Sequence, residues 1–304
     1  DGAQNNTIQN NTIDLNRTYQ NTFGIYSNST HSAILVTTTA TATTAAGGNS
    51  GLKIYSNTIT DVNNGIVVVG PTAAADFNNV VDIGGASLAT GNTITNYGTT
   101  GTFSSYVNVS GTVNGVLVRN SINFNVSYNS ITSSNGGVTA GTINGIQIPA
   151  FTVAPTGTFT NNINNNTLSV KSGLIAGAIN GINSLGTSAS ATSTLNINNN
   201  EFNNFGHTVA GTATIILINN TGTHQFQNIN NNTFTNLNVN TTGSVTFIQN
   251  TNSNPTAGGI KNVNNNNDQH PQGKYLQQQT ARINTVNHNN NNYNNDLSFC
   301  TYGN

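Results

Sequence analysis

One short frame recurs along the chain and constrains its fold more than any other feature. The frame is an aliphatic residue, two further residues, an asparagine, one residue, and a second aliphatic or aromatic residue. Complete copies are Ile8/Asn11/Ile13, Ile54/Asn57/Ile59, Val126/Asn129/Ile131, Ile163/Asn166/Leu168, Ile197/Asn200/Phe202 and Ile229/Asn232/Phe234, and partial copies are Asn92/Ile94, Val263/Asn266 and Val286/Asn289. From Asn57 to Asn266 the asparagines are 32 to 37 residues apart. Such a period predicts a repeated structural unit.

A second motif lies between these frames. It reads "NGIVV" at 64, "NGVLV" at 114, "NGIQI" at 144 and "NGINS" at 180, with "TIILI" at 214 and "SVTFI" at 244 in the equivalent place. Each unit therefore supplies short β-type segments separated by turn-forming residues, and no amphipathic helical period extends over three turns. We predict an all-β parallel solenoid of about eight coils with a repeat of roughly 35 residues.

The recurring asparagine fits a sharp corner between two short strands. Asparagine tolerates the left-handed conformation that a tight corner requires, and stacked asparagines can form an amide ladder from coil to coil. We predict a structural ladder of Asn11, Asn57, Asn92, Asn129, Asn166, Asn200 and Asn232. The alternative is that these asparagines merely occupy exposed turns.

Composition separates a folded solenoid from a disordered polar tract. Asparagine makes up about a fifth of the chain, yet 34% of the residues are hydrophobic and these are regularly spaced, which favours a folded chain. Only 5% of the residues are charged and the net charge is -1, which argues against nucleic acid or an anionic membrane surface as partner. The longest apolar runs are short, so no membrane-spanning segment is expected.

The chain is expected to be one solenoid over residues 1–304, with a weaker final coil over 268–304. It contains no methionine, which indicates a segment of a longer or polymeric assembly, or a chain whose leader has been removed. The single cysteine, Cys300, excludes an internal disulfide framework. Loops rich in Thr, Ala, Gly and Ser, at 37–51, 99–111 and 150–157, are expected to project from the rod.

The "IxxNxI" and "NGIxI" segments cover nearly the whole chain, and with them the chain resembles the right-handed parallel β-helix proteins, the pectate-lyase-like superfamily in the broad sense. That group includes polysaccharide lyases, glycoside hydrolases, phage tailspikes and large bacterial surface adhesins. The low charge and the Asn/Thr-rich texture look most like the adhesins. The resemblance implies a right-handed coil, in line with the crossover rule, and an extracellular or cell-surface location in bacteria.

An enzyme on such a scaffold needs paired or clustered carboxylates. Asp61, Asp76 and Asp82 are the sole acidic cluster, and Arg119 follows one coil later. A lyase-like site of Asp61, Asp82 and Arg119 is one reading, and single charges that solvate a coil surface are the other. The "NTD", "DD", "GHG" and "RIK" of the polygalacturonase-like members are absent; the nearest match is "RIN" at 282.

We therefore expect no catalytic residues and no cofactor. Metal binding is also not expected, because the histidines are scattered and lack an HExxH spacing. They are His31, His207, His224, His270 and His288, and exposed turns are the expected position for each.

Three functions fit these features. The first is a structural or adhesive rod that associates with itself end to end or contacts glycans or surfaces. The second is binding or cleavage of a polysaccharide, with Phe103, Tyr106 and Phe151 as stacking surfaces or as loop anchors. The third is ice binding by rows of threonine. Since "VTTTATATT" at 36–44 occurs in one loop and does not recur coil by coil, we expect no ice binding.

Overall fold

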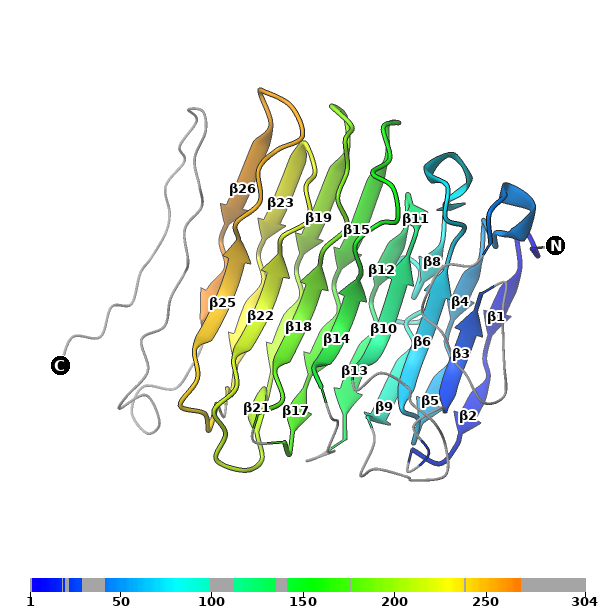
Figure 1. Cartoon of the computed structure of the whole chain (residues 1–304). Coiled ribbons are helices and arrows are strands. Elements are labelled where there is room, and N and C mark those ends of the chain that lie inside the picture. Colours follow the sequence, from blue (N-terminus) through cyan, green and yellow to red (C-terminus); the bar gives the residue numbers. More distant parts are fainter. Residues whose placement is uncertain are drawn as a thin grey trace.

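The chain folds into a stack of short parallel strands. The computed structural model describes residues 2–17, 19, 22–28, 42–98, 112–134, 141–174, 176–237 and 239–268. Within these ranges the strands lie side by side from β1 at one end to β25 and β26 at the other (Figure 1). The only helices described are two short 3-10 turns, η1 (Ala45–Gly47) and η2 (Ala74–Asp76). The prediction of an all-β parallel solenoid is confirmed, and the right-handed sense of the coil stays a prediction.

Three long sheets form the sides of the solenoid. Sheet A consists of β1 (Thr7–Gln9), β4 (Lys53–Tyr55), β8 (Asp82–Ile83), β12 (Asn125–Ser127), β15 (Thr160–Asn164), β19 (Thr194–Asn198), β23 (Phe226–Asn230) and β26 (Ile260–Asn264). Sheet B consists of β2 (Thr12–Asp14), β5 (Thr58–Thr60), β9 (Thr93–Tyr97), β13 (Ser130–Ser133), β16 (Thr167–Ser169), β20 (Glu201–Asn203), β24 (Thr233–Thr235) and β27 (Asn267–Asp268). Sheet C consists of β3 (Phe23–Ser27), β6 (Asn64–Val69), β10 (Val113–Arg119), β14 (Ile143–Ile148), β18 (Ile179–Ser184), β22 (Ile215–Asn220) and β25 (Val245–Asn250).

Each coil passes through sheets A, B and C in that order before the chain returns to sheet A. The strands β4, β5 and β6 form one such coil, and each pairs in parallel with its counterpart in the next. Two small sheets extend the corners, β7 (Asn78–Asn79) with β11 (Ser121–Ile122) and β17 (Lys171–Ser172) with β21 (Gly206–His207). Because one coil uses one copy of each motif, the sequence period is the length of a coil.

The core is a narrow column of aliphatic and aromatic side chains. In the second coil Ile54 of sheet A, Ile59 of sheet B and Ile66 of sheet C are all fully buried. Equivalent positions in the next coils repeat this burial, so each coil stacks its apolar residues on those of its neighbours. Towards the C-terminal end phenylalanine replaces isoleucine in sheet B, and Phe202 and Phe234 stack with ring centroids 5.1 Å apart. Continuous burial along the axis supplies the main driving force for folding.

At the corner between sheets A and B, one residue turns the chain and the next residue supplies the ladder amide. Positive φ angles occur one residue before the ladder position, as at Ser56 (52°), Tyr128 (61°) and Asn165 (58°). The ladder asparagines are not among the described residues with positive φ. The expectation that they adopt the left-handed conformation themselves is therefore wrong. The preceding residue turns the chain, and the asparagine that follows directs its amide into the corner.

The glycines of the "NG" motif are required by the close packing of sheet C against sheet B. Gly65, Gly115, Gly145 and Gly181 lie in sheet C and face the inward side chains of sheet B. A Cβ atom on Gly145 would lie 2.5 Å from Cδ2 of Leu168 and 2.7 Å from the carbonyl oxygen of Gly181. The glycines thus allow sheets B and C to approach closely, at a spacing that no other residue permits.

Replacing this glycine tests the close approach. We expect Gly145→Ala to lower the free energy of unfolding by on the order of 2 kcal/mol, because the added methyl group overpacks a filled core. Chemical denaturation followed by circular dichroism measures the change. Gly157→Ala is the matched control, since a Cβ there meets nothing within 4 Å. Equal stability of the two variants would contradict the packing argument.

Candidate functional site

The predicted asparagine ladder is present, and each buried rung uses all of its side-chain hydrogen-bonding groups. Nδ2 of Asn166 donates to Oδ1 of Asn200 at 3.0 Å and to the carbonyl oxygen of Val126 at 2.8 Å. Oδ1 of Asn166 accepts from both Nδ2 and the backbone N–H of Asn129, each at 3.0 Å. A buried amide with two donors and two occupied acceptor sites is fully satisfied.

The same pattern continues along the stack. Nδ2 to Oδ1 distances of 2.9 to 3.1 Å link Asn11, Asn57, Asn92, Asn129, Asn166, Asn200, Asn232 and Asn266 in that order. The six from Asn57 to Asn232 are buried, so the alternative of exposed turns is wrong for them, whereas Asn11 at the end of the stack is exposed. The ladder extends one rung beyond the predicted set, to Asn266.

A second ladder in sheet C escaped prediction. Asn114 donates to Asn64 at 3.3 Å, Asn144 to Asn114 at 2.9 Å and Asn180 to Asn144 at 2.9 Å through their side-chain amides. These are the asparagines of the "NG" motif, and all four are buried. The ladder stops where Ile216 takes the next position in register. The recurrence of Asn before Gly was the signal that could have revealed it.

The carboxylate of Asp82 accepts hydrogen bonds from three neighbouring residues. The donors are the hydroxyl of Tyr55 at 2.6 Å, Nδ2 of Asn125 at 2.7 Å and the backbone N–H of Gly85 at 3.1 Å. Burial, followed by the bond to this carboxylate, raises the pKa of Tyr55 above its ordinary value. The carboxylate thereby fastens the turn after β8 to the neighbouring coils.

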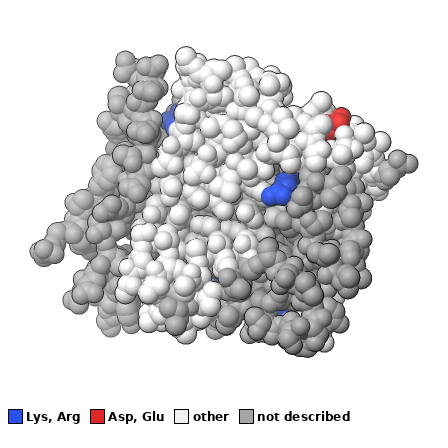
Figure 2. Space-filling model, viewed as in Figure 1, with Lys and Arg blue, Asp and Glu red and all other residues white. Residues whose placement is uncertain are grey.

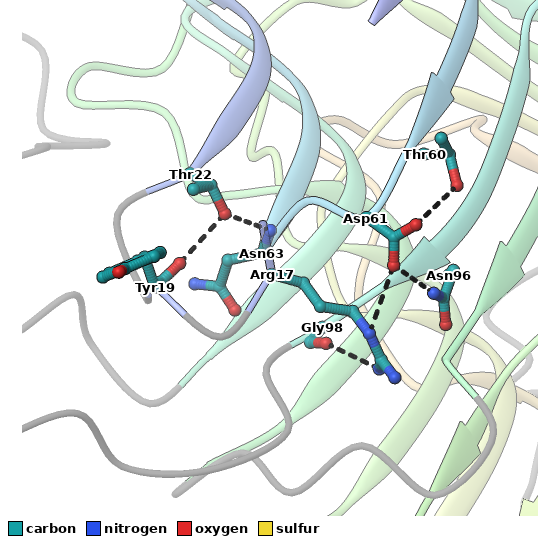
Figure 3. Close-up of polar contacts among 8 residues, drawn as sticks. All are labelled: Arg17, Tyr19, Thr22, Thr60, Asp61, Asn63, Asn96 and Gly98. Atoms are coloured by element: carbon teal, nitrogen blue, oxygen red, sulfur yellow. Dashed lines mark hydrogen bonds and ion pairs between the residues drawn. The ribbon is translucent and has the colours of Figure 1, made fainter. Parts of the chain in front are cut away.

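Asp61 lies at a different corner, between sheets B and C. It forms an ion pair with Arg17, whose Nε lies 3.5 Å from Oδ1, and it accepts hydrogen bonds from Asn96 and Thr60 (Figure 3). Arg17 also donates from Nη1 to the carbonyl oxygen of Gly98 at 3.4 Å. This contact joins three successive coils and is the only ion pair among the described residues.

The lyase-like reading of Asp61, Asp82 and Arg119 gains no support from these positions. Asp82 begins a strand of sheet A, Asp61 follows a strand of sheet B, and Arg119 ends a strand of sheet C. Asp76 ends η2, outside the three sheets. The described ranges contain no group of three His, Cys, Asp or Glu side chains that could hold a metal ion.

Two of the five histidines contradict the expectation of exposed turns. His207 and His224 are both 1% exposed, while His31, His270 and His288 lie outside the described residues, as does Cys300. The ring of His224 packs edge-on against Phe159, and its Nε2 lies 3.4 Å from Nδ2 of Asn161. Burial lowers the pKa of His207 and lowers the pKa of His224 to about 3. Both rings are parts of the interior, where burial disfavours their protonated form.

Among the loop aromatics, Phe151 is an anchor. Its ring packs against Phe77 with centroids 5.5 Å apart and against the main core. Phe103 and Tyr106 lie outside the described residues, as do residues 37–41 and the whole 99–111 loop.

The outer face of sheet A carries two columns of asparagine over its last four strands. The first is Asn162, Asn196, Asn228 and Asn262, and the second is Asn164, Asn198, Asn230 and Asn264. In the first column each amide after Asn162 donates to the asparagine of the preceding coil at 2.8 Å. In the second column, each Oδ1 except the last accepts a hydrogen bond from a backbone N–H of the next coil, at 2.9 to 3.0 Å. The Nδ2 groups of this column have no partner in the described part of the chain. The face therefore offers hydrogen-bond donors about 4.8 Å apart.

Charge is scarce on the surface as well as in the sequence. On the face seen in Figure 2, acidic and basic side chains occupy only small isolated patches. No helix in the described ranges is long and apolar enough to cross a membrane. The face in Figure 2 therefore presents mainly neutral groups.

The chain was compared with protein-family models, curated proteins and solved structures, and none of them matches it.

Removing one rung tests the ladder. We expect Asn166→Ala to lower the free energy of unfolding by on the order of 3 kcal/mol, because it leaves the buried backbone N–H of Asn129 without its acceptor and breaks the amide bonds to Asn129 and Asn200. Thr167→Ala, at the adjacent exposed position, is the matched control and should change stability little. The measurement is urea denaturation of the three proteins. A loss for Asn166→Ala no larger than for the control would show that the ladder is dispensable.

The buried histidine predicts a pH dependence of stability. In the folded state burial lowers the pKa of His224 to about 3. In the unfolded chain the pKa of a histidine is about 6.5. Below that pH the unfolded chain binds a proton that the folded chain excludes, so stability should fall as the pH drops from about 6.5 towards 3. Denaturation of the wild type and His224→Gln across this range measures the effect. The variant should lose part of the slope; identical slopes would refute the assignment.

Proposed function

We propose that the chain is a structural and adhesive rod. The observation that supports this most is the amide ladder, which joins eight successive asparagines without interruption. Parallel sheets hydrogen-bonded along the axis resist separation of the coils, since many bonds must break together. Such a rod can hold a partner or a surface at a distance.

Self-association is the second part of the proposal. The end strands of the three sheets pair on one side only within the described ranges. Unpaired strand edges are templates for further strands, so one copy can extend the sheets of another. The low charge of the chain, with a net value of -1, offers little repulsion against such stacking.

An uncharged glycan is the second candidate partner. The two asparagine columns on sheet A favour it, because side-chain amides can donate to and accept from sugar hydroxyl groups. Binding of a negatively charged polymer would need basic groups that this face lacks over its last four strands. Lys261 of β26 is in register with the buried residues Leu195 and Gln227, on the inward side of the strand. The bacterial cell surface or its exterior is the location that fits such a role, as the resemblance to surface adhesins implies.

Electron microscopy of the purified protein, with light scattering over a range of concentrations, tests the rod. We expect rods that lengthen by end-to-end contact as the concentration rises. Ile13→Lys should prevent lengthening, because Ile13 packs against the core from the terminal strand β2 and a stacked copy would bury the charge.

The matched control is Thr12→Lys, since Thr12 is exposed on the outer face of the same strand. Circular dichroism should show that both variants keep their sheet structure. Strictly monodisperse wild-type monomers at high concentration would count against self-association. Failure to bind any glycan on an array would remove the glycan as a partner.

A further inference from the structure

The outer face of sheet B carries a regular array of hydroxyl groups. One column in register is Thr12, Thr58, Thr93, Ser130, Thr167, Glu201 and Thr233. A parallel column two residues further along the strands begins with Asp14, Thr60, Thr95, Thr132 and Ser169. The four strands β5, β9, β13 and β16 therefore form a block of six threonines and two serines, which we call the threonine face.

The hydroxyl groups of the threonine face are mostly free to bind a ligand. Thr58, Thr93, Ser130 and Thr167 are exposed, and the second column is half-buried. Only Thr60 donates to a protein group, a weak bond of 3.4 Å to Asp61. The other seven hydroxyls have no protein partner within the described ranges. On sheet A, by contrast, the amides of the first asparagine column are already bonded to one another.

The backing of the threonine face is rigid. Between the two columns, Ile59, Ile94 and Ile131 point inward and are fully buried. The residue before each strand is a ladder asparagine, whose amide fixes the height of one coil on the next. The hydroxyls therefore repeat about 4.8 Å apart along the axis and roughly 6.6 Å apart along each strand.

We propose that the threonine face binds ice. The exposed planes of ice carry rows of oxygen atoms whose repeats are on the scale of these two spacings, so a rigid two-dimensional array can match several lattice positions at once. Threonine suits such a contact because its hydroxyl bonds to water while its methyl group excludes it. Many weak contacts made together give net binding only if the array is ordered in advance, as this one is.

Other occupants fit the threonine face less well. Its eight side chains include no aromatic ring on which a sugar could stack and no charge that could hold an ionic partner. Asp14 and Glu201 lie beyond its two ends and limit its length. Unlike the single threonine loop at 36–44, on which the expectation of no ice binding is based, the rows of the threonine face recur coil by coil directly after the ladder asparagines.

Freezing hysteresis and inhibition of ice recrystallisation by the purified protein test the proposal. We expect the wild type to show both, and Thr93→Lys to lose most of both, because a long charged side chain at the centre of the array prevents flat contact. Thr156→Lys, which places the same charge at an exposed threonine in the loop between β14 and β15, away from sheet B, should keep wild-type activity. Thermal denaturation of both variants should confirm that they are folded.

Three results would overturn the proposal. They are a wild type without activity in either assay, a Thr93→Lys variant with full activity, or a loss confined to Thr156→Lys. Binding to crystalline cellulose or chitin that Thr93→Lys abolishes, with both ice assays silent, would assign the threonine face to a glycan instead. None of these results depends on the rod assembling end to end, so the two proposals fail separately.

Discussion

The amide-to-amide hydrogen bond between successive coils is the interaction on which the rest of the structure depends. A buried amide without partners costs about 1–3 kcal/mol, and only the asparagines one coil above and below can satisfy both ends of Asn166. The ladder therefore fixes which residue of one coil lies above which residue of the next. A slip by one residue would break every rung and turn the apolar side chains outward.

This fixed register also orders the outer surface. Once Asn92, Asn129 and Asn166 are aligned, the residues one and three positions later must form straight columns on sheet B. Like charges placed directly opposite one another on neighbouring strands are destabilising, so a stack of near-identical coils favours neutral polar side chains. The scarcity of charge, 5% of the residues, follows from the architecture as well as from any partner.

The proposed functions use different parts of the same scaffold. Self-association would use the two ends, a glycan would use the asparagine columns of sheet A, and ice would contact the threonine face of sheet B. The two partly buried carboxylates and the buried ring play another part: Asp82, Asp61 and His224 each hold neighbouring segments together. An adhesive solenoid needs no catalytic group, because repetition of weak neutral contacts can supply its affinity.

The sequence by itself determined the solenoid, its period, its inward aliphatic positions and the ladder from Asn11 to Asn232, because each coil repeats the same local pattern. It did not determine which residue takes the left-handed corner, since asparagines stand side by side there, as Asn165 and Asn166 do. Burial of His224 and the pairing of Asp61 with Arg17 depend on segments far apart in the chain. The threonine face likewise exists only after stacking, because hydroxyls some 35 residues apart in sequence become neighbours when coils lie in register.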